Sequence, residues 1–121
     1  GDEELEGYEP PLPLCADESC IHLGEVEAAA RRYQMINIKL DKCGGLTHGI
    51  EIAQEARRRN LDVMVGNMGG TSLAMAPAFV MALLGGDHHD IDGPLLLKYD
   101  RPPAMTYNGS VLMPPPSGIW G

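Results

Sequence analysis

The sequence predicts an α/β fold in which about four parallel strands alternate with helices. Short segments in which apolar and polar residues alternate are each followed by a longer segment with helical periodicity. In two of these units a glycine pair, Gly44-Gly45 or Gly69-Gly70, turns the chain from strand to helix. Units of this length are joined by right-handed crossovers, so the strands run parallel.

The clearest strand covers residues 35–40. Its period places Ile36 and Ile38 on one face and Asn37 and Lys39 on the other. Because the strand lies between two helical segments, we expect both of its faces to be covered. A lysine near the C-terminal end of a (β/α) barrel strand lies where such barrels carry their chemistry, so Lys39 is the first candidate catalytic residue.

The remaining elements follow the same patterns. Three further strands are expected, at residues 12–17, 62–66 and 88–92. Helices are expected at residues 24–33, 46–59 and 77–85. Pro77 lacks an amide hydrogen, so we expect a short turn over residues 72–76 and a new helix with Pro77 in its first position.

The length of the chain sets the expected extent of the fold. A closed eight-stranded barrel needs roughly 250 residues. The 121 residues are therefore expected to form a C-terminal half-barrel, a partial (β/α)₈ TIM barrel that covers residues 1–121. A proline-rich tail, residues 99–121, carries a hairpin strand at residues 110–113.

Composition excludes several classes of partner. The net charge is −8, and no basic patch is present, which argues against nucleic acid and anionic membranes. The longest apolar run, residues 73–84, is too short to span a bilayer. Three cysteines without CxxC spacing favour a reduced, cytoplasmic protein and no structural zinc site.

Two ionisable residues, Asp17 and Lys39, lie at the ends of consecutive strands with the same inward parity. Asp17 is either an acid that caps a turn or a hard oxygen ligand suited to Mg²⁺. Lys39 is either a solvated or ion-paired lysine or a desolvated general base with a depressed pKa. The pattern of residues leaves both choices open.

The last expected strand carries Asp90 and Asp92 on one face. Two carboxylates this close repel each other unless a cation lies between them, and either a metal ion or an organic ammonium would serve. Asn67 follows the third strand, so a polar side chain is expected at the C-terminal end of every strand.

Four motifs at these strand ends resemble the enolase superfamily. They are Ala16-Asp17-Glu18-Ser19; Asn37-Ile38-Lys39-Leu40 with Lys42-Cys43-Gly44-Gly45; Met64-Val65-Gly66-Asn67-Met68; and Asp90-Ile91-Asp92-Gly93-Pro94-Leu95. The resemblance is to the muconate-lactonizing-type branch, and within it to dipeptide epimerases of the L-Ala-D/L-Glu epimerase kind. It runs from about Leu12 to the C-terminus, with the motifs in the order and spacing of the family.

The resemblance implies a role for each strand end. In that family three carboxylates bind Mg²⁺ and two lysines flank the α-carbon of the substrate. On this mapping Asp17 is one of the three metal ligands and Lys39 is one of the two acid/base lysines. Asp90 and Asp92 match the pair that binds the free ammonium of a dipeptide. Asn67 and Met68 fall on the substrate side of the site.

The implied activity is that of an isomerase. Epimerisation of a dipeptide is a 1,1-proton transfer through an enediolate that Mg²⁺ stabilises. N-acylamino-acid racemase, o-succinylbenzoate synthase and muconate cycloisomerase are the alternatives on the same fold. Asp90 and Asp92 favour a substrate with an ammonium group, because the synthase and cycloisomerase substrates carry no cation for that pair.

The resemblance covers only part of such an enzyme. The N-terminal capping domain, the second lysine and two of the metal carboxylates have no counterpart in residues 1–121. We therefore expect that this C-terminal half alone is inactive and binds Mg²⁺ poorly. The rival hypothesis is a non-catalytic half-barrel whose open strand edges associate with a partner half or with a second copy.

Overall fold

A computed structural model describes residues 1–121. Four parallel strands form one sheet in the order of the sequence, β1-β2-β3-β4. The strands are β1 (Cys15–Ala16), β2 (Met35–Lys39), β3 (Asp62–Gly66) and β4 (His88–His89). The predicted α/β class with about four parallel strands is confirmed, and the sheet does not close into a barrel.

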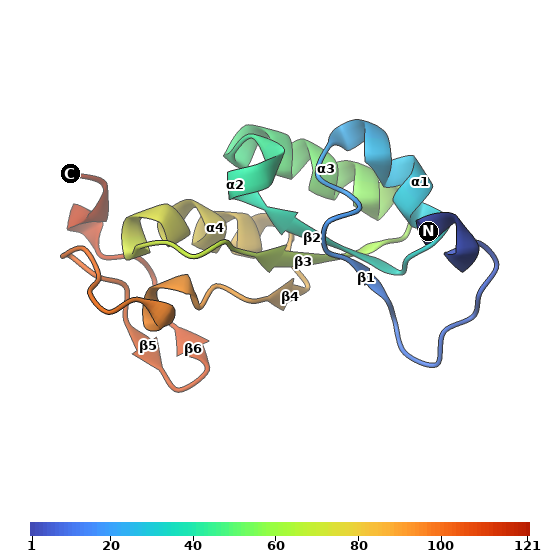
Figure 1. Ribbon diagram of the computed structural model, residues 1–121. Helices are drawn as coiled ribbons and strands as arrows, with labels where there is room; N and C mark the ends of the chain where they lie inside the picture. The colour runs from blue at the N-terminus through green and yellow to red at the C-terminus, as the bar shows by residue number, and fades with distance from the viewer.

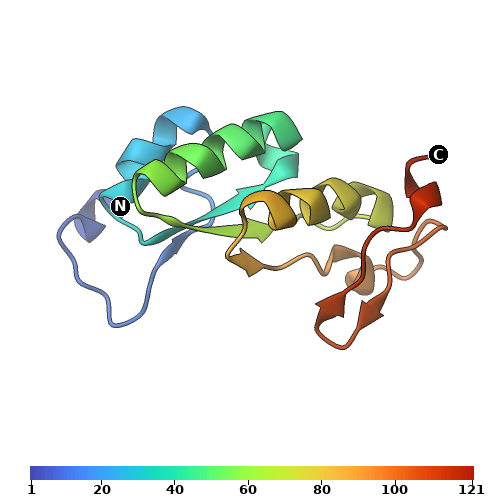
Figure 2. The ribbon, with the colours of Figure 1, turned by 180° about the vertical axis from the view of Figure 1, so that it is seen from behind.

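The helices lie along one face of this sheet (Figures 1 and 2). They are α1 (Val26–Ala30), preceded by the 3₁₀ turn η2 (Leu23–Glu25), then α2 (Leu40–Cys43), α3 (Leu46–Arg58) and α4 (Ser72–Gly85). No helix covers the other face, where Met35 and Met64 are half-buried. The expectation that both faces of the strand at residues 35–40 are covered is therefore wrong.

The core lies between the two central strands and the helices. Ile36, Ile38, Val63 and Val65 are each at most 2% exposed and belong to one apolar cluster with α3 and α4. Full burial of an aliphatic side chain of this size contributes roughly 1.5–3 kcal/mol. Along these strands, the apolar residues of the alternating pattern lie on the helix-covered face, and the residues between them lie on the open face.

The two edge strands are shorter than predicted. At one edge Pro13 has no amide hydrogen to donate, and regular pairing begins only at Cys15. At the other edge the amide of Asp90 still donates to Val65 O at 2.9 Å, but the chain then turns into η3 (Gly93–Leu96). Residues 90–92 therefore form a loop rather than the end of a strand.

Helix α4 is continuous through Pro77, contrary to the predicted break at this residue. Proline at this position removes one intrahelical hydrogen bond, to the carbonyl of Leu73, and typically costs about 3 kcal/mol in a helix interior. Burial of Met75 and Met81, on either side of the proline, offsets this cost. The short helix α2, which follows β2 directly, was not predicted, and Gly44 ends it with φ 93°.

The tail returns to the N-terminal end of α4. Its hairpin pairs β5 (Tyr107–Asn108) with β6 (Val111–Leu112), which confirms the strand predicted at residues 110–113. The chain ends in η4 (Ser117–Trp120), and Ile119 is 1% exposed. An N-terminal 3₁₀ turn, η1 (Asp2–Leu5), completes the elements, none of which has the length and hydropathy needed to span a bilayer.

Candidate active site

The candidate residues gather along one edge of the sheet, because the C-terminal ends of parallel strands lie at the same edge. Asp17 follows β1, Lys39 ends β2 and Asn67 follows β3. Asp90 and Asp92 follow β4. The structure therefore brings every strand-end residue of the sequence analysis to the same edge, where neighbouring strands link some of them directly.

A cluster of alternating charge occupies the β1–β2 end of this edge. Lys39 Nζ lies 2.9 Å from Asp17 Oδ2 and 3.2 Å from Glu18 Oε1. Lys42 also pairs with Glu18. The side chain of Lys39 is only 12% exposed, whereas that of Asp17 is 55% exposed. Asp17 therefore offers an open carboxylate edge while the lysine is sheltered beneath it.

These contacts set the protonation states of the cluster. The hydrogen bond from Lys39 lowers the pKa of Asp17, and Lys42 and Lys39 lower that of Glu18. The pKa of Lys39 is raised, first by its hydrogen bond to Asp17, although partial burial opposes the change. Of the two alternatives left open for Lys39, this arrangement favours the ion-paired lysine, because ion pairing outweighs desolvation. The two carboxylates therefore favour the protonated form of Lys39.

Asn37 supports this cluster from below. Its side chain is 5% exposed, and Nδ2 donates to Asp17 Oδ1 at 2.6 Å. The amide oxygen of Asn37 is buried and has no hydrogen-bond partner. A Cβ atom on the neighbouring Gly66 would lie 2.5 Å from that oxygen, so the glycine provides the space for the amide. Sequence reasoning missed this role, and its one signal was a polar residue two positions before the lysine.

Asn67 and Met68, which the resemblance maps to the substrate side, both make hydrogen bonds to neighbouring loops. Asn67 Nδ2 donates to the carbonyl oxygen of Asp90 at 2.5 Å, so this amide is engaged by the neighbouring loop. The amide of Met68 donates to Asp41 Oδ2 at 3.1 Å, while the Met68 side chain is 44% exposed. Asp41, which the sequence analysis did not consider, thus ties the loop after β3 to the start of α2.

The acid pair at the β4 end has no basic partner. Asp90 and Asp92 are exposed, and neither forms an ion pair. Partial desolvation of the otherwise exposed Asp90 carboxyl and the adjacent charge of Asp92 raise the pKa of Asp90, and the charge of Lys39 opposes this change. Both residues line a cleft of about 480 Å³ between α4 and the tail hairpin, and eight of its 13 lining residues are hydrophobic. Such a pair is suited to bind a cation from solution.

The described residues do not assemble a complete metal site. No group of three or more His, Cys, Asp or Glu side chains is placed to hold an ion. Asp17 is a hard oxygen donor of the kind that Mg²⁺ prefers, but both of its oxygens already accept hydrogen bonds from Asn37 and Lys39. These residues therefore fit one ligand of a metal ion and no more.

Comparison with protein families identifies the chain. A family model described as "Enolase C-terminal domain-like" matches residues 3–119, so the chain belongs to this family. The chain is 45% identical to an N-acetyl-D-glutamate racemase from Pseudoalteromonas sp., over 99% of this chain and 38% of that protein. It is 42% identical to the L-Ala-D/L-Glu epimerase of Escherichia coli K12, over 88% of this chain and 33% of that protein.

Solved structures agree with this membership. An enolase family member from Agrobacterium tumefaciens, described as homologous to dipeptide epimerases and bound to sodium and L-Ala-L-Glu, superposes with a TM-score of 0.93 at 46% identity. That match covers 99% of this chain and 36% of the other. A dipeptide epimerase from Methylococcus capsulatus, complexed with Mg and L-Arg-D-Lys, gives 0.77 at 30% identity over 83% of this chain and 30% of its own. The chain thus spans about a third of the length of the relatives it matches.

Proposed function

We propose that this chain forms part of an isomerase that epimerises dipeptides by moving the α-proton of the substrate. In this proposal Lys39 is one acid/base residue, and Asp17 is one ligand of a Mg²⁺ ion. Asp90 and Asp92 bind the free ammonium of the dipeptide. The observation that carries the proposal is the unpaired acid pair at one end of the edge, opposite a protonated lysine at the other end.

The geometry supports proton transfer at the β1–β2 end of the edge and substrate binding at the β4 end. A bound Mg²⁺ would supply positive charge next to the substrate carboxylate. Lys39 holds a proton that it can deliver to the α-carbon, and once Asp17 is engaged elsewhere the raised pKa of the lysine would fall. Asp90 and Asp92 fix the other end of the substrate, which orients the α-carbon relative to Lys39.

Racemisation of an N-acylated amino acid is the second candidate. The relative from Pseudoalteromonas that carries this activity in its name is 45% identical to this chain. An N-acyl substrate has no ammonium for the acid pair, so the two candidates differ in what Asp90 and Asp92 contact.

The test compares both substrates with the complete gene product. L-Ala-L-Glu and N-acetyl-L-glutamate are incubated separately with the enzyme and Mg²⁺ in D₂O. Exchange of the α-proton is followed by NMR, and the chirality of glutamate is determined after hydrolysis. Exchange with inversion of the dipeptide is expected. Turnover of the N-acetyl substrate alone would overturn the proposal in favour of the racemase.

The isolated chain is expected to be inactive. Residues 1–121 contain a single candidate acid/base lysine and a single candidate metal carboxylate at the sheet edge. We therefore expect weak Mg²⁺ binding in calorimetry and no turnover of L-Ala-L-Glu. Robust turnover by the purified 121-residue chain would refute this expectation.

A further inference from the structure

The loop that carries the acid pair is held at two consecutive main-chain carbonyls. Asn67 Nδ2 donates to the carbonyl oxygen of Asp90 at 2.5 Å. The hydroxyl of Tyr107, in the tail hairpin, donates to the carbonyl oxygen of Ile91 at 2.7 Å. The side chain of Ile91 is itself only 7% exposed. The backbone between Asp90 and Asp92 is therefore fixed from two separate elements.

The fit of Asn67 depends on the glycine that follows the pair. A Cβ atom on Gly93 would collide with Asn67 Oδ1 and would lie 3.2 Å from the carbonyl oxygen of Met68 and 3.3 Å from Met75 Sδ. Real Cβ atoms do not approach oxygen this closely, so the side-chain amide lies against the loop only because residue 93 has no side chain.

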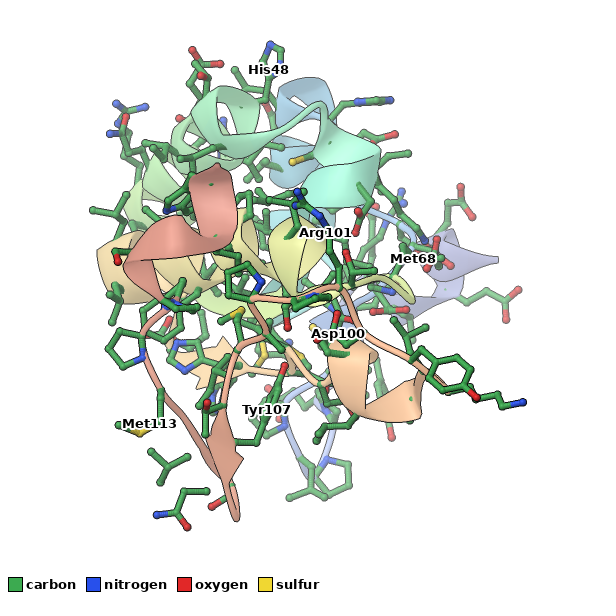
Figure 3. The ribbon with its side chains drawn as sticks, turned by 90° about the vertical axis from the view of Figure 1, so that its left-hand side faces the viewer. His48, Met68, Asp100, Arg101, Tyr107 and Met113 are labelled. Atoms are coloured by element: carbon green, nitrogen blue, oxygen red, sulfur yellow. The ribbon has the colours of Figure 1, made fainter.

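Tyr107 is held in turn by the N-terminal end of α4. The amide of Ser72 donates to Asp100 Oδ1 at 2.8 Å, and its hydroxyl also donates to that carboxylate. The amide of Met105 donates to Ser72 Oγ at 2.8 Å. Ser72 is fully buried, and the tail crosses the N-terminal end of α4 between Asp100 and Tyr107 (Figure 3). The hairpin that presents the tyrosine is thus anchored two residues before it.

The hydrogen bonds to the loop matter because the carboxylates of Asp90 and Asp92 repel each other. Neither Asp90 nor Asp92 forms an ion pair, so a free loop would relax by moving the two carboxylates apart. A loop held at both intervening carbonyls keeps the pair together before any cation arrives. Preorganisation of this kind improves affinity, because less ordering remains to be done on binding.

We propose that Tyr107 and Asn67 are positioning residues that hold Asp90 and Asp92 in a cation-binding geometry and thereby set the preference for substrates with a free ammonium. This inference rests on the proposed function, since it assigns the ammonium of the dipeptide to the acid pair. It gives the tail hairpin a part in substrate selection, although the hairpin contributes no group to the chemistry.

The experiment compares Tyr107→Phe with Tyr99→Phe in the complete gene product. Both changes remove one hydroxyl, but Tyr99 is 79% exposed and its hydroxyl makes no hydrogen bond, so it is the matched control. Each variant is assayed with L-Ala-L-Glu and with N-acetyl-L-Ala-L-Glu, which lacks the ammonium. For Tyr107→Phe the KM for the free dipeptide should rise about five- to tenfold, the loss expected for one hydrogen bond. Its kcat and its KM for the acetylated dipeptide should stay within about twofold, and Tyr99→Phe should match the wild type.

The outcomes separate this inference from the function on which it rests. Equal KM increases for both substrates, or no increase for either, would show that the hydroxyl has only a structural role and would overturn the inference. A wild-type enzyme that does not distinguish the two substrates would overturn both the inference and the proposed function of the acid pair. If Tyr107→Phe does not fold, Gly93→Ala is the second variant: its Cβ atom displaces the Asn67 amide from the Asp90 carbonyl, and it must show the same selective loss.

Discussion

The two ends of the candidate site differ in how their charges are balanced. At the β1–β2 end the acids Asp17 and Glu18 face Lys39 and Lys42. At the β4 end neither carboxylate forms an ion pair, and the charge of Asp92 acts most strongly on Asp90, with the charge of Lys39 acting more weakly. The carboxyl pKa values respond in opposite directions, since pairing with Lys39 lowers that of Asp17, whereas burial and Asp92 raise that of Asp90.

This difference distinguishes an end of the site whose charges are paired within the chain from an end whose charges are not. The first end is electrically satisfied by residues of the chain, so its lysine holds a proton without help from a substrate. The second end keeps an excess of negative charge, since neither Asp90 nor Asp92 forms an ion pair. The contrast leads to four predictions, from the largest expected effect to the smallest.

Replacement of the lysine at the balanced end should have the largest effect. Lys39→Ala in the complete gene product should lower the rate of α-proton exchange about 10²- to 10⁴-fold, the range typical of a lost acid/base group. Lys42→Ala is the matched control, because it removes the other lysine that pairs with Glu18. A Lys39→Ala enzyme that exchanges as fast as the control would remove the lysine from the mechanism.

Neutralising the unbalanced end should affect binding rather than chemistry. Asp90→Asn combined with Asp92→Asn should raise the KM for L-Ala-L-Glu about 10- to 100-fold, because hydrogen bonds to charged groups contribute about 1.5–3 kcal/mol. Asp62→Asn, an exposed acid at the opposite end of β3, is the control in the same assay. Unchanged dipeptide affinity in the double variant would assign the ammonium to another site.

Adding an atom beside Asn37, which supports the balanced end, should destabilise the fold. Gly66→Ala would place a Cβ atom 2.5 Å from Asn37 Oδ1 and displace the amide that holds Asp17. Overpacking of this kind costs typically about 1–3 kcal/mol, which urea unfolding measures. Gly69→Ala, where nothing lies within 4 Å of the added atom, should be near neutral. Equal stabilities of the two variants would show that the space beside Asn37 is not limiting.

Replacing one aspartate by asparagine at each end should change the free energy of unfolding at pH 7 in opposite directions. The folded-state pKa of Asp17 lies below its ordinary value of 3.8, so its ionised form stabilises the fold above that pH and Asp17→Asn destabilises. The folded-state pKa of Asp90 lies above 3.8, so its ionised form destabilises and Asp90→Asn stabilises. Both carboxylates are exposed, which limits each change to about 0.5 kcal/mol.

Urea unfolding between neutral pH and pH 3 checks the signs. The advantage of Asp90→Asn should disappear as the pH falls through the raised pKa toward 3.8. The deficit of Asp17→Asn should persist to lower pH and vanish only below the lowered pKa. Parallel pH curves for the two variants would contradict the proposed difference between the ends.

Local periodicity accounts for what could be predicted of the fold. The strand at residues 62–66 was predicted to the residue, and the helix at residues 46–59 to within one residue, because each buries one regular face. The prediction failed where distant contacts compensate for a local penalty. The burial of Met75 and Met81 keeps α4 continuous through Pro77, and an edge position shortens β1 and β4.

The sequence by itself determined the fold class, the central strands and the identity of the ionisable residues that follow the strands, because periodicity and residue type are properties of neighbouring positions. The tertiary structure alone decided which of these residues meet. Asn37 reaches Asp17 across 20 positions, and Tyr107 reaches the loop of the acid pair across 16. Hydrogen bonds over such separations depend on the packing of whole elements, so no local pattern encodes them.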